Sequence, residues 1–343
     1  MNGKKFLYSA IYGFSPQKTM EFFEKNGAKL KIERGNRVFP DSNKSSDIIA
    51  ALNRAAEQSG VRTVFEKVDD IRILNEGFLV ASGRREEEFD KIIIACGGLS
   101  YPLTGSTGDG YRFAESFGHK IIKPRAALVP LLLKDDVSQL QGLSLKNVNV
   151  SIKVCGKVFS EFGEMLFTDK GVSGPVILSL SSFVNKYDLS SAVLSIDLKP
   201  ALDEEKLGKR VLCDFEKYKN KQYKNSLGDL LPKKLIGYFI KYTGINPDKE
   251  VNSITRSERT IIVNALKNLT FYIKSTDRIE SGIITAGGID LNEVNPKTME
   301  SKLVPGLYFA GEVLDADALT GGYNLQIAFS TGYIAGKNAG EEK

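Results

Sequence analysis

The spacing of hydrophobic and polar residues changes along the chain, and each spacing predicts a different kind of element. Ser15 followed by Pro16 is typical of a helix start, and the apolar residues that follow end at Gly27. A second helix is predicted over residues 46–59, where apolar residues recur at helical spacing. Short apolar runs between turn-forming residues then predict three strands, the last two as a hairpin, over residues 61–68, 71–74 and 78–81.

A different pattern begins at residues 89–95. The run Ile92-Ile93-Ile94 lacks polar alternation, which predicts a strand buried on both faces, as in a parallel sheet. At residues 148–154 apolar and polar residues alternate, as in an antiparallel sheet with one wet face, and lysine-rich helical stretches follow. From residue 282 onward glycine-punctuated apolar runs return, with strands predicted at 282–289 and 307–310 and a helix at 324–335.

This change of pattern in the middle of the chain predicts two domains. Residues 1–127 and 277–343 form one α/β domain, and residues 128–276 are inserted into it. The chain of 343 residues is long enough for both domains to have a buried core.

Composition excludes several kinds of site. The 47 lysines and arginines exceed the 42 acidic residues by only five, far short of the field of a dedicated nucleic-acid binder. Cys96, Cys155 and Cys213 are too far apart in sequence for a local zinc or disulfide centre, and we expect no metal. The single histidine, His119, excludes a site with two imidazoles, and its place after Gly118 predicts a solvated residue near a helix end.

The sequence also lacks the signals of membrane insertion and export. No apolar run approaches the roughly 20 residues that span a bilayer, and residues 1–14 match a signal peptide poorly. Cysteines without local partners fit a reducing compartment. We therefore expect a cytoplasmic protein without a membrane partner, and leave its oligomeric state open.

Glycines directly precede a predicted helix at two places, where unpaired backbone N–H groups attract anions or electron-rich rings. The first is residues 105–110, where a plain helix cap explains the glycines equally well. The second is Gly321-Gly322, ahead of the last helix. Gly311-Glu312 ends the strand before it, and a carboxylate in such a place can bind sugar hydroxyls, although an acidic surface loop is the alternative.

Together with Ala95-Cys96-Gly97-Gly98, these segments resemble the BaiN/YhiN-type family of FAD-dependent oxidoreductases, which are flavoproteins with two dinucleotide-binding domains and are also labelled the aminoacetone oxidase family. Each segment is unspecific alone, but their order and spacing match along essentially the whole chain. The matching segments are residues 2–10, 33–40, 95–98, 163–168, 171–175 and 306–332.

The resemblance implies an α/β, Rossmann-like FAD-binding domain interrupted by a domain of β-barrel and helical parts on the substrate side. It implies that Glu312 holds the ribityl chain, and that the helix opening at Gly322 directs its N–H groups at the pyrimidine end of the flavin, where negative charge gathers on reduction. It also implies hydride transfer through flavin N5, between NAD(P)H or an organic donor and a small organic acceptor such as an enone. The residues implied in cofactor binding are Ala95, Gly97, Gly98, Gly311, Glu312, Gly321, Gly322, Tyr323, Asn324, Leu325 and Gln326.

One motif of the family is missing from this sequence. Such flavoproteins begin with a strand, a G-x-G-x-x-G turn and a helix that hold the FAD pyrophosphate, and no G-x-G-x-x-G occurs here. We hypothesise that Met1 is an internal methionine of a longer protein and that the first βαβ segment is absent, which N-terminal sequencing of the native protein tests. A truncated, non-catalytic binding module is the alternative to an active enzyme.

Single residues allow other interpretations. Lysines and tyrosines interleave over residues 217–225, as in basic grooves that stack bases, but a solvated segment is expected there and nucleic acid is not expected as a partner. Cys96 is expected to be a small buried residue at a glycine turn rather than a redox thiol. Asp109, Arg37 and Tyr323 are candidate site residues, and no catalytic acid or base is assigned.

Overall fold

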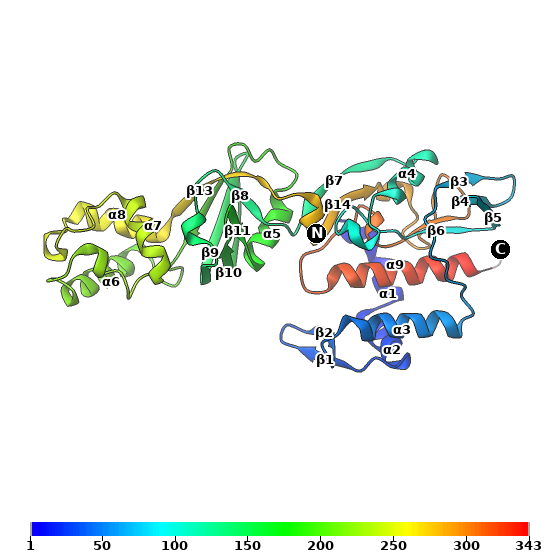
Figure 1. Ribbon diagram of the computed structural model, residues 1–343, viewed down its shortest axis with the longest axis horizontal. Helices are drawn as coiled ribbons and strands as arrows, with labels where there is room; N and C mark the ends of the chain where they lie inside the picture. The colour runs from blue at the N-terminus through cyan, green and yellow to red at the C-terminus, as the bar shows by residue number, and fades with distance from the viewer. Residues whose placement is uncertain (1, 342–343) are drawn as a thin grey trace. The chain divides into compact units, whose positions relative to one another are not determined.

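The computed structural model describes residues 2–341 and shows a mixed α/β protein with two compact units. The first unit is formed by Met1–Arg125 and Ile283–Lys343, and the second by Ala126–Gly282. The first unit contains small sheets with helices around them (Figure 1): α1 (Lys4–Gly13), α2 (Pro16–Lys25), β1 (Leu30–Glu33), β2 (Arg37–Pro40), α3 (Ser45–Gln58), β3 (Asp70–Ile73), β4 (Phe78–Ser82), β5 (Arg85–Phe89), β6 (Ile92–Ile94), α4 (Asp109–Ser116), β7 (Ile121–Ala127), β14 (Ile284–Ile289), β15 (Leu307–Phe309) and α9 (Tyr323–Gly340).

The parallel pairing of β6 with β15 organises the first unit. Leu307, Tyr308 and Phe309 lie opposite residues 92–94, and all three are fully buried. Their side chains join those of α1, α4 and α9 in one hydrophobic core. The long helix α9 runs alongside α1 (Figure 1). This packing fixes the ends of both strands relative to the start of α9.

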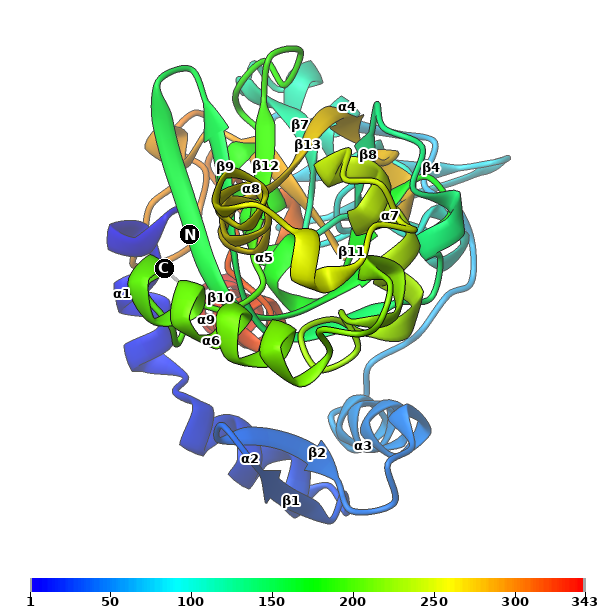
Figure 2. The same cartoon turned by 90° about the vertical axis from the view of Figure 1, so that its left-hand side faces the viewer.

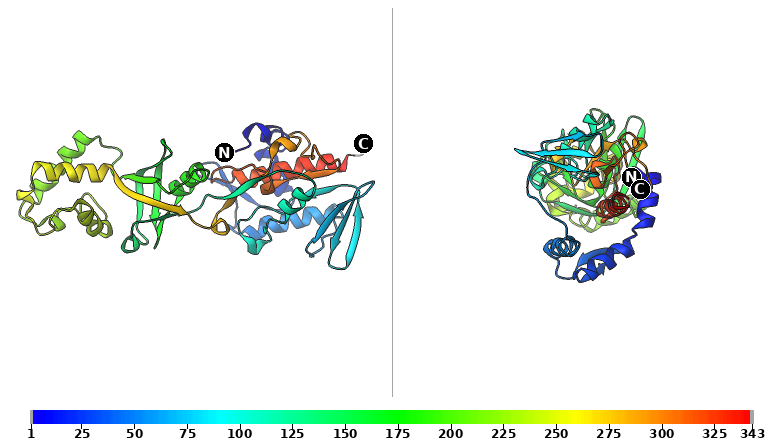
Figure 3. Two further views of the ribbon diagram at one scale, coloured as in Figure 1. Left: turned by 90° about the horizontal axis from the view of Figure 1, so that it is seen from above. Right: turned by 90° about the vertical axis from the view of Figure 1, so that its right-hand side faces the viewer.

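Several predicted elements of the first unit are confirmed. Helix α2 begins at Pro16, and the Ser15 hydroxyl accepts a hydrogen bond from the Lys18 N–H, as expected for a helix cap. Helix α3 and the hairpin of β3 and β4 also match their predictions. Strand β5 pairs with β4 to complete a three-stranded sheet, which projects from the unit in Figure 3. Neither β5 nor α1 was predicted.

Two strand predictions were wrong. Residues 61–68 form no strand, because their side chains are almost all exposed and no neighbouring strand pairs with them in the described chain. In the 89–95 segment Phe89 belongs to β5, and β6 is parallel as predicted but is not buried on both faces. Ile93 is 40% exposed because β15 is the one strand that pairs with β6 among residues 2–341.

The second unit is built on a closed barrel of six strands in the order β10-β11-β8-β13-β12-β9. Its helices α6, α7 and α8 lie together at one end of the barrel, as Figures 1 and 2 show. The elements are β8 (Leu131–Leu133), β9 (Ser144–Val154), β10 (Lys157–Phe167), β11 (Gly171–Ser173), α5 (Pro175–Val184), β12 (Val193–Asp197), α6 (Glu204–Lys217), α7 (Lys233–Thr243), α8 (Arg256–Lys267) and β13 (Leu269–Thr276).

Alternation along β9 explains how the barrel core is filled. Val148, Val150, Ile152 and Val154 are buried in the core of the unit, whereas the residues between them are more exposed. The predicted antiparallel sheet with one wet face is therefore confirmed. The alternation within one strand did not predict that the sheet closes into a barrel. The implied β-barrel and helical parts of the inserted segment are both present.

His119 is buried rather than solvated, which corrects the prediction for this residue. Its Nε2 lies 2.8 Å from the Ser301 hydroxyl and its Nδ1 lies 3.2 Å from Glu293 Oε2. The ring also packs edge-on against Phe309 of β15. The segment after α4 thus runs into the core instead of ending at the surface.

Replacing His119 tests this role in the core. Burial lowers the pKa of His119, and Glu293 offsets part of the effect. Because the folded pKa lies below the unfolded one, wild-type stability is full above about pH 6.5 and is lost as the pH falls below it. We expect His119→Gln to cost about 1–3 kcal/mol near neutral pH. This deficit should narrow on acidification, as measured by urea unfolding across pH, and a deficit independent of pH would contradict the assignment.

Candidate functional site

The carboxyl ends of β6 and β15 lie side by side, because the two strands are parallel. Just beyond the strands, the Ala310 N–H donates a hydrogen bond to the Ile94 carbonyl at 3.1 Å. The turns Gly97-Gly98 and Gly311-Glu312 therefore follow two adjacent strand ends. Two of the predicted segments, which are more than 200 residues apart in sequence, meet at one edge of the sheet.

A hydrogen-bond network centred on Thr285 of β14 joins the two turns. The Thr285 N–H donates to Glu312 Oε1 at 2.8 Å, and the Thr285 hydroxyl accepts from the N–H groups of Leu99 at 2.8 Å and Ser100 at 3.1 Å. Gly98 fits between them because it has no side chain. A Cβ there would lie 2.4 Å from Thr285 Oγ1 and 2.8 Å from Glu312 Oε1.

The beginning of α9 forms the third part of the candidate site. Its N-cap, Gly322, has a φ of +88°, no side chain caps the helix, and no atom lies within 4 Å of the place of its missing Cβ. The first N–H groups of the helix therefore lack intrahelical partners and receive no side-chain cap. The Thr331 hydroxyl on the same helix accepts from the Gly311 N–H at 2.9 Å, which ties α9 to the Gly311-Glu312 turn.

The predicted residues at the start of α9 contribute in different ways. The Asn324 side chain bonds both the N–H and the carbonyl of Ala318, and Gln326 Nε2 donates to the Phe14 carbonyl. Both side chains are therefore engaged in hydrogen bonds within the protein. At the start of α9 the backbone N–H groups, rather than these side chains, are the groups that a ligand could contact. The side chains of Tyr323 and Leu325 are exposed.

Ala95 and Cys96 are exposed as well, at the end of β6. The expected burial of Cys96 was wrong, because the end of this strand is covered less than the sequence pattern suggested. A role in cofactor binding remains a prediction for all eleven residues.

Two half-buried acidic groups, Glu312 and Asp315, lie at the site. Burial raises the pKa of Glu312 and of Asp315, although hydrogen bonds from Thr285 and Asn2 partly oppose this. Burial also raises the pKa of Tyr111, and the nearby Glu312 adds to the effect. Tyr111 Oη and Asp315 Oδ1 are buried with no hydrogen-bond partner among residues 2–341. Such atoms mark places where a ligand or a water supplies the missing bond.

These features fit the ribityl and isoalloxazine parts of FAD. A carboxylate, an uncapped helix N-terminus and unpaired buried polar atoms are the donors and acceptors that those parts need. The sequence supplies no G-x-G-x-x-G loop for the pyrophosphate. No local pattern in the sequence marks Thr285, Thr331 and Tyr111, because their importance depends on contacts between distant segments.

Other candidate residues lie elsewhere or have other partners. Asp109 forms ion pairs with Lys67 at 3.4 Å and Arg112 at 3.5 Å, and a hydrogen bond from Thr107 lowers its pKa. Arg37 lies over the ring of Phe39 in the β1–β2 hairpin. Within the segment 105–110, Gly108 is the N-cap of α4 and Gly110 lies in the first turn of that helix. The alternative of a plain helix cap therefore applies to Gly108.

The lysine-rich segment 217–225 does not form a stacking groove. Lys217, Lys219 and Lys224 form ion pairs with carboxylates at 2.6–2.8 Å, and Tyr223 is fully buried. The exposed lysines agree with the expected solvated segment, whereas the buried Tyr223 does not.

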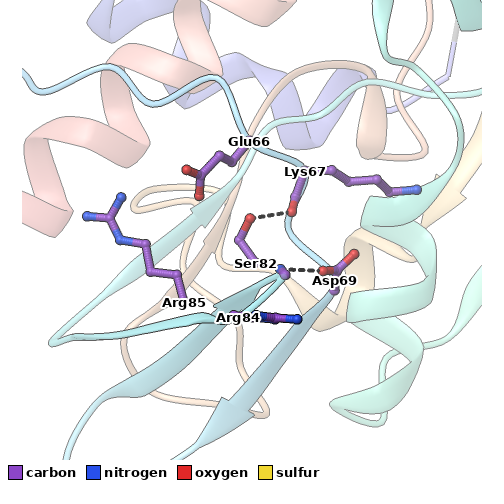
Figure 4. A pocket seen from close by; sticks show the side chains of 7 residues that line it. Glu66, Lys67, Asp69, Ser82, Arg84 and Arg85 are labelled. Carbon is purple, nitrogen blue, oxygen red and sulfur yellow. Dashed lines mark hydrogen bonds between the residues drawn. The ribbon is translucent and has the colours of Figure 1, made fainter.

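A surface hollow of about 730 Å³ lies beside the turn between β4 and β5 (Figure 4). The Ser82 hydroxyl donates to the Lys67 carbonyl, and the Gly83 N–H donates to Asp69. None of the predicted cofactor residues lines it, and its charged lining does not suit a flavin ring. Its lining residues are Glu66, Lys67, Asp69, Ser82, Gly83, Arg84 and Arg85.

Residues 2–341 contain neither a metal-binding cluster nor a membrane-spanning helix. No cluster of three or more His, Cys, Asp or Glu side chains in this part of the chain is arranged to hold a metal ion. None of its helices has the length and apolar character needed to cross a membrane.

Comparison with protein families matches residues 1–338 to the HI0933-like protein Rossmann domain. The chain belongs to this family. The resemblance seen in the sequence is thereby confirmed, and HI0933-like proteins are flavoproteins, which supports an FAD-dependent oxidoreductase.

Three relatives align with nearly the whole length of this chain. A 3-dehydro-bile acid delta(4,6)-reductase of Clostridium scindens is 28% identical over 98% of this chain and 83% of its own length. A ribosomal RNA dihydrouridine synthase of Haemophilus influenzae is 31% identical over 96% of this chain and 80% of its own. The enzyme of the same name from Escherichia coli is 29% identical over 97% and 81%.

The names of these relatives correct one expectation. Nucleic acid was not expected as a partner, because the net charge is small, but two of these relatives are named for ribosomal RNA. Net charge was a poor guide here because it averages over the chain. Lysine and arginine outnumber acidic residues within residues 126–282, whereas the two balance in the rest.

A substitution at Gly98 tests the packing of the site. The Cβ of Gly98→Ala would meet Thr285 Oγ1, so we expect a loss of about 1–3 kcal/mol in the free energy of unfolding. Gly332→Ala in α9 is the matched control, because no atom lies within 4 Å of its Cβ position, and it should gain about 0.4–1 kcal/mol. Urea unfolding measures both, and equal effects would contradict the close packing around Thr285.

Proposed function

We propose that this HI0933-like protein uses FAD to reduce a C=C bond conjugated with a carbonyl, with NAD(P)H as the electron donor. The observation that carries the proposal is the meeting of the Gly97-Gly98 turn with the Gly311-Glu312 turn, to which Thr331 of α9 is bonded, in a flavoprotein-family chain. The overall reaction adds a hydride that originates from NAD(P)H, and a proton from water, across the double bond. FAD, when bound, supplies the two-electron carrier between donor and acceptor.

The reactions implied by the names of the relatives support this reaction class. A 3-dehydro-bile acid with double bonds at positions 4 and 6 is a conjugated dienone, and a uracil C=C bond is conjugated with a ring carbonyl. In both cases hydride addition is favoured because the carbonyl accepts the developing negative charge. The two names therefore describe one kind of reduction on different substrates.

The protein's own residues would bind and orient the cofactor. The N–H groups at the start of α9 would stabilise negative charge on the pyrimidine side, and Glu312 would accept hydrogen bonds from the ribityl hydroxyls. Gly322 would allow a flat ring to approach the backbone, since nothing fills its Cβ position.

A uridine in RNA is the second candidate substrate, and two observations favour it. Two of the three relatives described above are named for ribosomal RNA. The basic excess of residues 126–282 places positive charge on the second unit, where an RNA backbone would be attracted.

Cofactor retention and turnover test the proposal directly. After incubation with FAD and desalting, the purified chain should keep a perturbed visible flavin band, and anaerobic NADH or NADPH should bleach it. Adding a cyclic enone should then restore the band and yield the saturated ketone. A colourless protein, or a reduced flavin that reacts with oxygen but not with the enone or with uridine in RNA, would contradict the proposal.

Glu312→Ala tests the carboxylate. Loss of its hydrogen bonds to the cofactor should weaken FAD binding by about tenfold or more. Glu115→Ala on the exposed side of α4 is the control and should bind FAD as the wild type does. Affinity is measured by flavin fluorescence titration, with circular dichroism to verify folding. Unchanged FAD affinity in a folded Glu312→Ala variant would remove Glu312 from the site.

A further inference from the structure

Thr285 of β14 contacts both glycine turns of the candidate site, although nothing so far gives it a role toward the cofactor. Its side chain is buried, and its hydroxyl oxygen accepts hydrogen bonds from the N–H groups of Leu99 at 2.8 Å and Ser100 at 3.1 Å. A hydroxyl has two lone pairs and one proton. Both lone pairs are therefore occupied, and the proton is left to be donated to an acceptor.

Two oxygens compete for that proton. The first is Ser100 Oγ, which lies 3.2 Å from Thr285 Oγ1. The second is Glu312 Oε1, which lies 2.8 Å from the place of the missing Gly98 Cβ, while Thr285 Oγ1 lies 2.4 Å from the same place. A carboxylate is the stronger acceptor, because hydrogen bonds to a charged group are about twice as strong as neutral ones. A hydrogen bond from the Thr285 side chain also lowers the pKa of Glu312, which identifies Glu312 as the acceptor.

The Glu312 carboxylate has no cation to stabilise its charge. None of the lysines and arginines in the described part of the chain pairs with it. Tyr111 of α4 is the titratable group that faces it, and burial raises the pKa of this tyrosine, so that it stays neutral; Cys96 and Asp315 face Tyr111 in turn. Burial raises the pKa of Glu312 as well. The N–H and the hydroxyl of Thr285 are therefore the groups that favour the ionised carboxylate.

The other carboxylate oxygen of Glu312 is open to a ligand. The Thr285 N–H donates to Oε1 at 2.8 Å, whereas Oε2 accepts no hydrogen bond from the residues that the structure describes. Oε2 is not sealed inside the protein, as the Tyr111 hydroxyl is, so a group outside the protein reaches it. An ionised oxygen accepts hydrogen bonds and donates none, which suits the hydroxyls of a polyol.

We propose that Thr285 positions Glu312 for the cofactor. Its N–H and its hydroxyl both donate to Oε1, which keeps the carboxylate ionised and leaves Oε2 to accept hydrogen bonds from the ribityl hydroxyls of FAD. The same hydroxyl holds the chain after Gly98, so one side chain fixes the turn and the acceptor together. Thr285 acts through Glu312 and does not itself contact the cofactor. This inference rests on the proposed function, and it identifies the residue that controls the carboxylate at that site.

A pH dependence of FAD binding follows from this arrangement. The pKa of Glu312 lies above its ordinary value, so the carboxylate gains a proton as the pH falls through that raised pKa. The neutral form accepts weaker hydrogen bonds from the ribityl hydroxyls. FAD affinity should therefore fall on acidification, and loss of the Thr285 hydroxyl should move this fall to higher pH.

Carbon-13 NMR of the carboxyl groups of the full chain, recorded across pH without FAD, tests the positioning role by itself. The signal of Glu312 is the one that is absent from Glu312→Gln. Thr285→Val removes the hydroxyl but keeps the backbone N–H and the shape, and it should raise the pKa of Glu312 above the wild-type value. Thr285→Ser keeps the hydroxyl and should restore the wild-type pKa. Thr285→Cys has a thiol, which is a weak donor, and should lie between them.

Flavin fluorescence titrations of the same variants across pH test the link to the cofactor. Near pH 7, Thr285→Val should weaken FAD binding by about 3- to 10-fold, and Thr285→Ser should bind within about twofold of the wild type. Glu312→Gln should lose the pH dependence, because its amide does not ionise. Thr260→Val, at an exposed position of α8, is the matched control and should behave as the wild type in both experiments.

Stability has to be separated from positioning, because Thr285→Val also leaves the N–H groups of Leu99 and Ser100 without their acceptor. A purely structural role would lower the melting temperature without moving the pKa of Glu312. If Thr285→Val does not fold, the comparison of Thr285→Cys with Thr285→Ser decides in the same way.

The outcomes distinguish this inference from the proposed function. An unchanged pKa of Glu312 in folded Thr285→Val or Thr285→Cys, or a Thr285→Ser variant that behaves like Thr285→Val, would overturn the inference even if FAD is retained. A pKa that rises in Thr285→Val and Thr285→Cys but not in Thr285→Ser would support the positioning role. That support would stand even in a chain that keeps no FAD, a result that contradicts the proposed function alone.

Discussion

The half-buried carboxylate of Glu312 joins distant segments of the first unit through its hydrogen bond from the Thr285 N–H. A carboxylate loses much of its solvation on burial, and it is tolerated where hydrogen bonds replace water. The Thr285 N–H provides that bond, and the Thr285 hydroxyl in turn holds the chain after Gly98. Three segments are therefore placed by one residue of β14, and the turn geometry around the candidate flavin site depends on this residue.

Polar side-chain atoms are placed differently in the two units. In the first unit, Tyr111 and Asp315 keep buried atoms without partners in the described chain, close to where the strand ends meet. In the second, alternation divides each barrel strand into an apolar inner side and a mixed outer side, so its polar groups and exposed rings lie on the surface.

Local signals predicted much of this fold correctly. The Ser15-Pro16 cap, the apolar spacing of α3, the β3–β4 hairpin and the alternation in β9 all depend on interactions within a few residues. Predictions failed where the answer depended on a distant partner. Residues 61–68 have strand-like composition but no strand to pair with, and His119 is buried because Ser301 and Glu293 reach it from a segment more than 170 residues away.

The sequence by itself determined the family, the α/β class, the glycine turns and most helices, because these follow from residue order and short-range backbone preferences. The tertiary structure alone decided that the Gly97-Gly98 turn, Glu312 and Thr331 of α9 come together, since parallel pairing of β6 with β15 and the contacts of Thr285 and Thr331 join segments far apart in sequence. It also decided which rings stay exposed, because the inside and the outside of a strand become distinct when the barrel closes.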